Sequence, residues 1–472
     1  MKKHKTHIVL TIVCLLQISC EDFVAIDTPN DRIVSEVVFN DDQTANSAVI
    51  GIYNELFRSD FSNGGIASVT MLGDLSADNL NTAYIDNVQL KEFENNQILI
   101  NNSYNLRIWS SAYNIIYMCN AVVDGLNRYS GVSQALKVQL IGEVQFVRAF
   151  VYFYLVNMYG EVPLVQSTDY RENATASRVA VEEVYDAIVA DLESAISVLG
   201  ESYEDEQYGR LRPNKFVATA LLARVYLFLE NWEQAEALSS IVINNSDDYG
   251  LLSNLDDVFL ANSREAIWQI TPAGGGALST VTNEAEKFIL MSNPMLSSQT
   301  PVVLSPDLIS SFEEGDLRLA NWIGTYSTDD ELFYYPYKYK KNRASEVAVT
   351  EYSMVLRLAE QYLIRAEARI HQGKLMEAID DLDKVRGRAN LELLSGSIPG
   401  IDEGALLDSI NIERRRELFT EWGHRWFDLK RMGLVNNVLS PSKPSWDNTD
   451  VLYPIPEEEV NKNPYLDQND GY

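Results

Sequence analysis

One hydrophobic helical segment constrains the fold of this chain more than any other feature. Between residues 144 and 159, only three polar residues interrupt a run of apolar and aromatic side chains. A helix that is hydrophobic on all sides must be covered by other elements, so we expect this one at the centre of the molecule. Gly160 and Pro163 predict its end, because glycine accepts a positive φ and proline cannot continue a helix.

Segments with helical periodicity surround this central helix in the sequence and supply its packing partners. Short polar connections between several of them predict antiparallel neighbours. Two hairpin-like pairs with small residues at the crossing, beginning near 221–224 and 362–365, resemble tetratricopeptide repeats without their regular spacing. The expected fold is therefore mainly α, a scaffold of tetratricopeptide-like hairpins. The helical segments are 41–57, about 105–127, 181–199, 214–230, 232–244, 352–388 and 404–432.

Two long segments break this periodicity. Residues 58–104 are rich in Gly, Asn and Asp, and we expect a long irregular loop there. Residues 250–350 combine a strand-like run, a glycine-rich stretch and crowded aromatic residues, and we expect an insertion with loops and strands there. Binding residues are often found on such loops, because a rigid body positions them.

The two insertions contain the candidate ligand-binding residues. Aromatic rings offer a bound ligand flat apolar faces, and carboxylates and amides offer it hydrogen-bonding groups. Helical hairpins bury their aromatic residues, so exposed rings are expected on the insertions. Most aromatic residues between 322 and 339 are nevertheless expected in the core, and Lys338 and Lys340 are expected on a solvated strand face. The candidate stacking residues are Tyr84, Phe288, Trp322 and Tyr334, and the candidate hydrogen-bonding residues are Asp74 and Asn79.

Cysteine and histidine counts exclude several kinds of chemistry. The chain has three cysteines and four histidines. Cys119, in a helical stretch, is expected to be a buried apolar residue, and no intrachain disulfide is expected. Only His371 and His424 lie outside the N-terminal segment, so a multi-histidine zinc centre is excluded and a serine–histidine triad is disfavoured. No cofactor is indicated.

The segment before residue 432 carries regularly spaced charges. Glu413, Glu417 and Glu421 recur every four residues, and Arg416 and Arg425 are spaced to pair with Glu413 and Glu421. Acid/base catalysis is one interpretation of these carboxylates. Structural ion pairs are the favoured one, because long charged side chains at helical spacing usually pair.

The N-terminus has the pattern of an export signal. Residues 1–19 contain three lysines and then a short apolar run, which is too short to span a bilayer. Cys20 follows a small residue, as in a lipoprotein signal, so we expect residues 1–19 to be removed and Cys20 to be lipidated. Residues 20–40 are then a lipid-anchored tether, and residues 41–472 are expected to form a single helical domain.

The charge balance disfavours anionic partners. The chain has 38 basic and 68 acidic residues, a formal net charge of −30. Removing residues 1–19 takes away lysines and no acidic residue, so the mature chain is still more acidic. Such a surface repels nucleic acid and anionic membranes, and it disfavours strongly anionic glycans.

Several separated motifs resemble one known family. The residues Gly142–Glu143, Arg148–Phe150, Tyr159–Gly160 and Val162–Leu164, together with the charged segment before 432, resemble the SusD/RagB family of Bacteroidetes surface lipoproteins. The resemblance implies a tetratricopeptide-like scaffold with a variable inserted half. It also implies nutrient capture at the outer membrane, facing the cell exterior, with a glycan as the usual ligand, a peptide as the exception, and a SusC-like TonB-dependent transporter as partner.

Three hypotheses for the function therefore stand side by side. The first is non-catalytic binding of an oligo- or polysaccharide and its delivery to the transporter, or the same role for peptides. The second is a secreted glycan hydrolase with paired carboxylates, although no spacing singles out a pair. The third is a helical scaffold that binds only protein. Release of products from glycans would favour the hydrolase, and gel retardation without products would favour the binding protein. Neither result would favour the scaffold.

Overall fold

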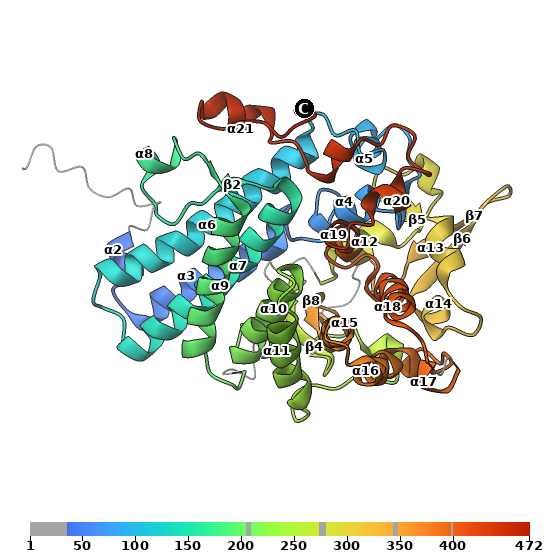
Figure 1. Ribbon diagram of the computed structural model, residues 1–472. Coiled ribbons are helices and arrows are strands. Elements are labelled where there is room, and N and C mark those ends of the chain that lie inside the picture. Colours follow the sequence, from blue (N-terminus) through green and yellow to red (C-terminus); the bar gives the residue numbers. More distant parts are fainter. Residues whose placement is uncertain (1–34, 204–208, 273–279, 343–347, 398–399) are drawn as a thin grey trace, which may run out of the picture.

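The central helix lies where the sequence predicts it. In the computed structural model, which describes residues 35–203, 209–272, 280–342, 348–397 and 400–472, α7 (Gln134–Tyr159) is buried along its C-terminal two thirds (Figure 1). Phe146 and Phe150 have no exposed surface, and both rings meet Trp268 edge to face. The helix ends at Gly160 with φ 72°, as predicted.

Helical hairpins wrap α7 and continue as a curved array. The helix α7 packs between α6 and α9, α9 packs on α10, α10 on α11, α11 on α15, and α15 on α16. Figure 1 shows these helices following one another from the left of the molecule to its lower edge. The expected mainly α, tetratricopeptide-like scaffold is confirmed. The bounds are α2 (Ser35–Val38), α3 (Asp42–Arg58), α6 (Ser103–Arg128), α9 (Val181–Val198), α10 (Lys215–Phe228), α11 (Trp232–Asn244), α15 (Leu358–His371) and α16 (Leu375–Arg388).

The large insertion leaves the scaffold after α11 and returns directly before α15, although these two helices pack together. Two antiparallel strands, β4 (Ala266–Ile270) and β8 (Ser353–Arg357), close its base. After β4 the insertion forms short helices and strands, because capping residues such as Thr282 and Ser305 start new helices there. These elements are α12 (Asn283–Phe288), β5 (Val302–Leu304), α13 (Pro306–Ser311), α14 (Leu317–Asn321), β6 (Ile323–Ser327) and β7 (Leu332–Pro336).

Residues 58–104 are not an irregular loop, and that expectation is wrong. They form α4 (Val69–Ser76), β1 (Leu80–Thr82) and α5 (Val88–Glu94), and α4 is buried along its whole length. Sequence periodicity does not mark α4, because every face of this short helix is covered.

The C-terminal helical segment is interrupted rather than continuous. It forms α18 (Glu403–Leu418) and α19 (His424–Arg431), and Thr420, Trp422 and Gly423 between them have positive φ. A Cβ added to Gly73 of α4 would lie 2.8 Å from the Cα of Gly423, so α4 packs directly into this break. The remaining elements are β2 (Val162–Pro163), α8 (Tyr170–Asn173), β3 (Arg178–Val179), α17 (Leu394–Ser397), α20 (Val435–Leu439) and α21 (Glu457–Lys462). None of the helices in the described ranges is both long and apolar enough to cross a membrane.

Candidate ligand-binding groove

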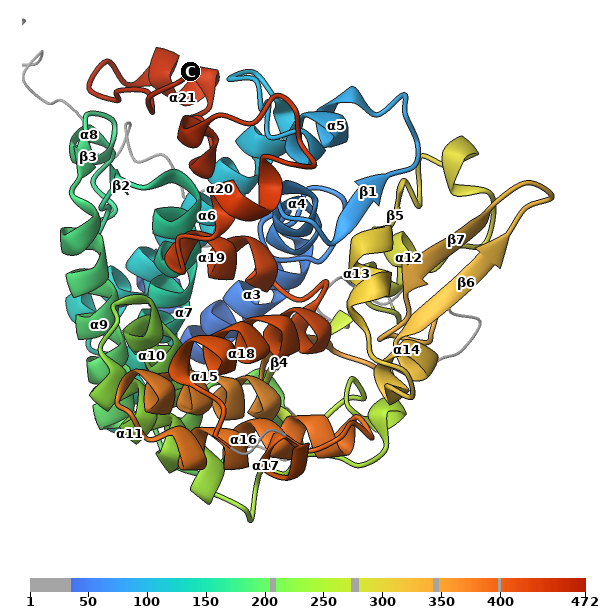
Figure 2. The same cartoon turned by 45° about the vertical axis from the view of Figure 1, so that its right-hand side comes forward.

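An open groove lies where the two insertions meet. Strand β1 of the first insertion pairs antiparallel with β5 of the second, with Leu80 opposite Leu304. The β6–β7 hairpin packs beside β5, and Figure 2 shows β1, β5, β7 and β6 next to one another. The groove between them has a volume of about 460 Å³. Its lining comprises Asn81, Thr82, Ala83, Met295, Val303, Leu304, Pro306, Ile309, Ser310 and residues 331–334.

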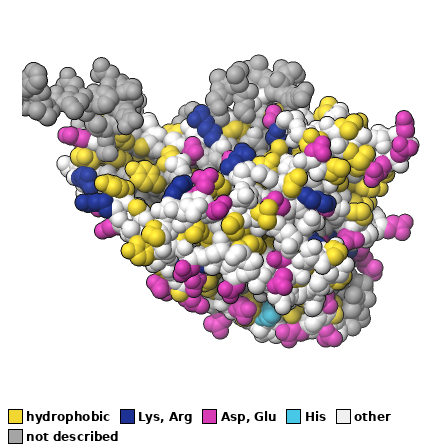
Figure 3. Space-filling view, turned by 90° about the horizontal axis from the view of Figure 1, so that it is seen from above, with side chains coloured by type: hydrophobic (Ala, Val, Ile, Leu, Met, Phe, Trp, Pro, Cys, Tyr) yellow, Lys and Arg dark blue, Asp and Glu magenta, His cyan; other side chains and the backbone are white. Residues whose placement is uncertain are grey.

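The chain exposes apolar side chains within a few residues of the groove residues Ala83, Met295 and Leu332. Leu296 is 81% exposed, Ile85 75% and Met291 71%, and the groove residues Met295 and Leu332 are also exposed. These residues come from the turn after β1, the turn before β5 and the start of β7. Figure 3, which views the molecule from above, shows hydrophobic side chains at the surface on its left side, its centre and its right side. Exposed apolar surface of this kind is typical of binding sites.

The groove is lined by apolar and uncharged polar groups with a single carboxylate. Glu331, which is exposed, is the one charged residue among the lining residues, so the groove holds no pair of carboxylates. Within the described ranges, no three His, Cys, Asp or Glu side chains come together as a possible metal site. The groove offers apolar surface, one half-exposed tyrosine ring at Tyr334, and the amide and hydroxyl groups of a few polar residues.

Buried ion pairs hold both ends of the β6–β7 hairpin against α18. Before β6, Arg318 donates to Glu413 at 2.6 Å and to Glu417 at 3.0 Å. After β7, Lys338 donates to Glu421 at 2.5 Å and to the backbone oxygen of Glu417. Burial lowers the pKa of Lys338 to about 8, and the nearby Glu421 carboxylate opposes that shift. The predicted solvated position of Lys338 is wrong, because this lysine anchors the hairpin inside the protein.

Two of the six predicted ligand-binding residues lie at the groove. Tyr334 is half-buried and lines it. Tyr84 is also half-buried and follows the lining residue Ala83, and the backbone N–H of Tyr84 donates to Pro301 at 3.1 Å. The structure therefore brings together one predicted residue from each insertion, and both remain candidates for ligand contact.

The other two aromatic candidates lie in the interior, so their expected exposure is wrong. Trp322 has no exposed surface, its Nε1 donates to the backbone oxygen of Leu255 at 3.0 Å, and its ring lies 4.9 Å from Lys338 Nζ. Phe288, at the end of α12, is 2% exposed and belongs to the main hydrophobic core. Both rings are covered because the elements of the insertion pack into the same main core as the scaffold helices.

The two predicted hydrogen-bonding residues are also buried, and both serve the fold. Asp74 accepts a hydrogen bond from the backbone N–H of Thr420 at 2.5 Å, and its burial raises its pKa to about 7. Asn79 accepts from Arg415 Nε at 3.0 Å, and its backbone oxygen accepts from Ser305. Asp74 therefore holds the break between α18 and α19, and Asn79 holds β1 in place.

The charged C-terminal segment forms structural ion pairs, as favoured from the sequence, but with other partners. Arg416 pairs with Glu313 and Arg425 with Asp78. Their expected partners are taken by other residues, Glu413 by Arg318 and Glu421 by Arg357. Glu417 is fully buried among guanidinium groups, and those of Arg388, Arg357 and Arg318 hold its pKa well below the usual range despite the burial. These carboxylates are closed to substrate. Cys119 is buried, as predicted.

Sequence reasoning missed the exposed apolar residues around the groove. Met291, Met295 and Leu296 lie around Pro294 in the short stretch before β5, where a solvated turn would normally carry polar residues. Apolar residues in a predicted turn are the feature of the sequence that could have indicated this exposed surface.

Known proteins resemble this chain along most of its length. One family model, described as "Starch-binding associating with outer membrane", matches residues 30–227, and another, described as "SusD family", matches residues 326–472. The SusD-like protein P25 of Formosa agariphila is 25% identical, over 96% of this chain and 96% of its own. A crystal structure of a SusD superfamily protein from Bacteroides vulgatus gives a TM-score of 0.79 at 20% identity, covering 92% of this chain and 100% of that one. A laminarin binding SusD-like protein gives 0.73 at 24% identity, covering 91% of this chain and 99% of that one.

The structure is a scaffold of tetratricopeptide-like hairpins with an open groove between its two insertions. With the two family matches at either end of the chain, the particular family follows. The chain belongs to the SusD/RagB family.

Proposed function

We propose that this protein is a non-catalytic glycan-binding protein of the outer membrane that captures an oligo- or polysaccharide for a TonB-dependent transporter. The observation that carries the proposal is the open apolar groove with Tyr334 in its wall and Tyr84 beside it. Apolar surface and half-exposed rings suit the C–H faces of sugars, and Asn81 and Ser310 supply polar partners for hydroxyl groups. Names of related proteins that mention starch and laminarin support the same ligand class.

The ligand is identified first by affinity gel electrophoresis on starch, laminarin and acidic polysaccharides, with a parallel assay for released sugars. Retardation without product supports the proposal, and released product supports the hydrolase. A peptide panel measured by calorimetry tests the alternative ligand, which an apolar groove with flexible methionine side chains can also accommodate. If no glycan binds and a peptide does, the ligand is a peptide, and the groove is still the proposed site.

The groove assignment is tested by Tyr334→Ala. Loss of a ring that packs against the glycan is expected to weaken binding about tenfold, which corresponds to about 1.4 kcal/mol. Calorimetry measures the affinity, and an unchanged melting temperature shows that the fold persists. Tyr170→Ala is the matched control, because Tyr170 is 77% exposed on α8, away from the groove. Equal losses in the two variants, or no loss at Tyr334, would place the ligand elsewhere.

The membrane location is proposed from the N-terminus, where Cys20 lies outside the described residues. Acyl chains on Cys20 would hold the protein on the outer membrane, since each buried CH₂ contributes about 0.8 kcal/mol. A Cys20→Ala variant is therefore expected in the soluble fraction after cell lysis. Unchanged membrane association of this variant would contradict the lipid anchor. Co-purification with a SusC-like transporter from the native membrane tests the proposed partner.

A further inference from the structure

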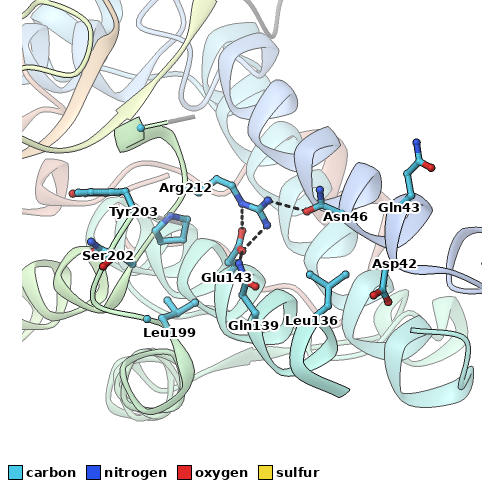
Figure 4. Close-up of a pocket in the computed structure, with 14 residues that line it drawn as sticks. Asp42, Gln43, Asn46, Leu136, Gln139, Glu143, Leu199, Ser202, Tyr203 and Arg212 are labelled. Carbon is cyan, nitrogen blue, oxygen red and sulfur yellow. Dashed lines mark hydrogen bonds and ion pairs between the residues drawn. The ribbon is translucent and has the colours of Figure 1, made fainter. Parts of the chain in front are cut away.

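A second cavity lies in the helical half of the molecule, formed by residues that the groove does not use. It has a volume of about 460 Å³, within the range of small-ligand sites. The N-terminal halves of α3 and α7 form one side of it, and residues 199–203 and 209–214 form the other (Figure 4). In Figure 1, α3, α7 and α9 lie on the left and the β6–β7 hairpin lies on the right, so this polar pocket and the groove are separate sites.

The inner wall of the polar pocket is a buried ion pair whose position is fixed from several sides. Glu143 is 1% exposed and accepts from Arg212 at 2.6 Å, from the Tyr53 hydroxyl at 2.6 Å and from Gln139 at 3.1 Å. Arg212 also donates to Asn46 at 2.8 Å. Figure 4 shows Arg212 between Glu143 and Asn46. The carboxylate and the guanidinium neutralise each other, so this wall presents fixed polar groups without net charge.

The remaining walls combine amide and hydroxyl groups with apolar surface. Gln43 and Ser202 are exposed at the pocket, and within the described ranges their side chains have no hydrogen-bond partner. The amide nitrogen of Asn46 donates no hydrogen bond there either. Amides offer a donor and an acceptor together, as each sugar hydroxyl does. The apolar part of the lining consists of Leu136, Leu199 and Pro213.

We propose that the polar pocket is a second carbohydrate site, which holds one or two neutral sugar units independently of the groove. Hydroxyl groups of the sugar pair with Gln43, Asn46 and Ser202, and its C–H face lies on the apolar side. The acidic residue Asp42, which accepts a hydrogen bond from the backbone N–H of Ser133 at 2.7 Å, lies at the pocket and disfavours anionic sugars. A pocket of this kind suits a free chain end or a short oligosaccharide, whereas the open groove suits the side of a longer chain.

The test measures binding of small sugars rather than of polysaccharide. Neutral mono- and disaccharides, glucosamine and glucuronate are titrated up to about 50 mM, a range that detects millimolar dissociation constants, by ligand-observed NMR and calorimetry. Ser202→Trp fills the exposed side of the pocket and is expected to weaken binding of the neutral sugar at least about tenfold, and Gln43→Ala about threefold. Both residues are exposed, so the fold is expected to persist, and melting temperatures check this.

Two control variants make the result specific. Gln134→Ala removes an exposed amide from the start of α7 that does not line the pocket, and Tyr334→Ala alters only the groove. Neutral-sugar binding that survives both controls and is lost in Ser202→Trp supports the proposal. Absence of binding by any neutral sugar, loss with Tyr334→Ala, unchanged binding in Ser202→Trp, or binding of glucosamine or glucuronate alone would overturn it. A groove that binds polysaccharide normally while the pocket binds nothing overturns this inference and leaves the proposed function intact.

Discussion

The buried ionic cluster at α18 and the open groove at β7 differ in how many charged side chains they contain and in whether those side chains reach solvent. Glu413 and Glu417 of α18, and Glu421 directly after it, are buried against arginines from α14, β8 and α16. Along the groove, Glu331 is the sole charged lining residue and it is exposed. The segment with the many charged residues in the sequence is buried, whereas the segments with few charged residues line a groove that is open to solvent.

The comparison teaches that the charged cluster positions the site instead of forming it. Burying a charge is costly unless partners satisfy it, so such clusters occur where several segments must meet in one arrangement. Here the partners come from both roots of the hairpin and from α18. The ionic cluster fixes the hairpin, and the hairpin presents the groove.

The largest expected effect comes from removing one carboxylate of the cluster. Glu417→Gln leaves Arg318, Arg357 and Arg388 facing a neutral amide, which should lower the free energy of unfolding by about 3 to 5 kcal/mol. Denaturant unfolding measures the loss, and glycan affinity of the folded fraction should be unchanged. Glu457→Gln, at an exposed position of α21, is the control and should alter neither quantity.

The same substitution has a pH signature. Because the pKa of Glu417 in the folded protein lies well below 4.5, its contribution is present above the unfolded-state pKa and is lost as the pH falls through the folded-state pKa. The parent should therefore lose stability below about pH 4.5 more steeply than Glu417→Gln. A variant that lost binding while keeping its melting temperature would place the ligand at the cluster and reverse the comparison.

A smaller effect of opposite sign is expected at Glu284, a buried carboxyl without a guanidinium partner. Burial raises its pKa to about 7, Ser353 donates to one oxygen, and the other oxygen has no hydrogen-bond partner. The folded-state pKa lies above the unfolded-state pKa, so this group lowers stability as the pH rises from about 4.5 to 7. Glu284→Gln should stabilise the protein at pH 8, by up to about 3 kcal/mol, and have little effect at pH 4.

Thermal unfolding of the parent and Glu284→Gln at the two pH values measures this gain. Ser353→Ala is the matched control, since it removes the one hydrogen bond to the carboxyl and should destabilise the protein at either pH. Destabilisation by Glu284→Gln at pH 8 would mean that the carboxylate is satisfied in the folded protein, and buried charge in the insertion would then resemble that at α18.

The scaffold could be predicted because its signals are local. The central helix is hydrophobic on every face, so it must be buried whichever elements pack on it. Gly160 ends the helix because glycine accepts the positive φ of a helix end. The strand Ala266–Ile270 and the buried Cys119 are likewise properties of short segments. Patterns of this kind do not depend on knowing which distant segment packs where.

The site could be predicted only in part, because burial in the insertions is set by distant contacts. Trp322 is enclosed partly through Leu255, and Lys338 reaches the interior through Glu421, contacts that no local pattern specifies. Tyr84 and Tyr334 were identified by residue type on an insertion, a rule that applied equally to the buried Phe288. These residues differ in how deeply their side chains are buried, and burial can be known only once the distant segments have been placed.

The smallest effect on stability is expected at Met291, where we nevertheless expect an effect on binding. This side chain is 71% exposed near the groove, so Met291→Ala removes little buried surface and should change the free energy of unfolding by less than about 0.5 kcal/mol. A glycan lying across the groove and its apolar border would lose a contact, and a roughly threefold loss of affinity is expected. Met376→Ala is the matched control, because Met376 is 65% exposed on α16 in the scaffold. Calorimetry on both variants decides the matter: equal affinities would remove the exposed apolar turn from the site, whereas a loss confined to Met291→Ala would show that residues contributing almost nothing to stability contribute to binding.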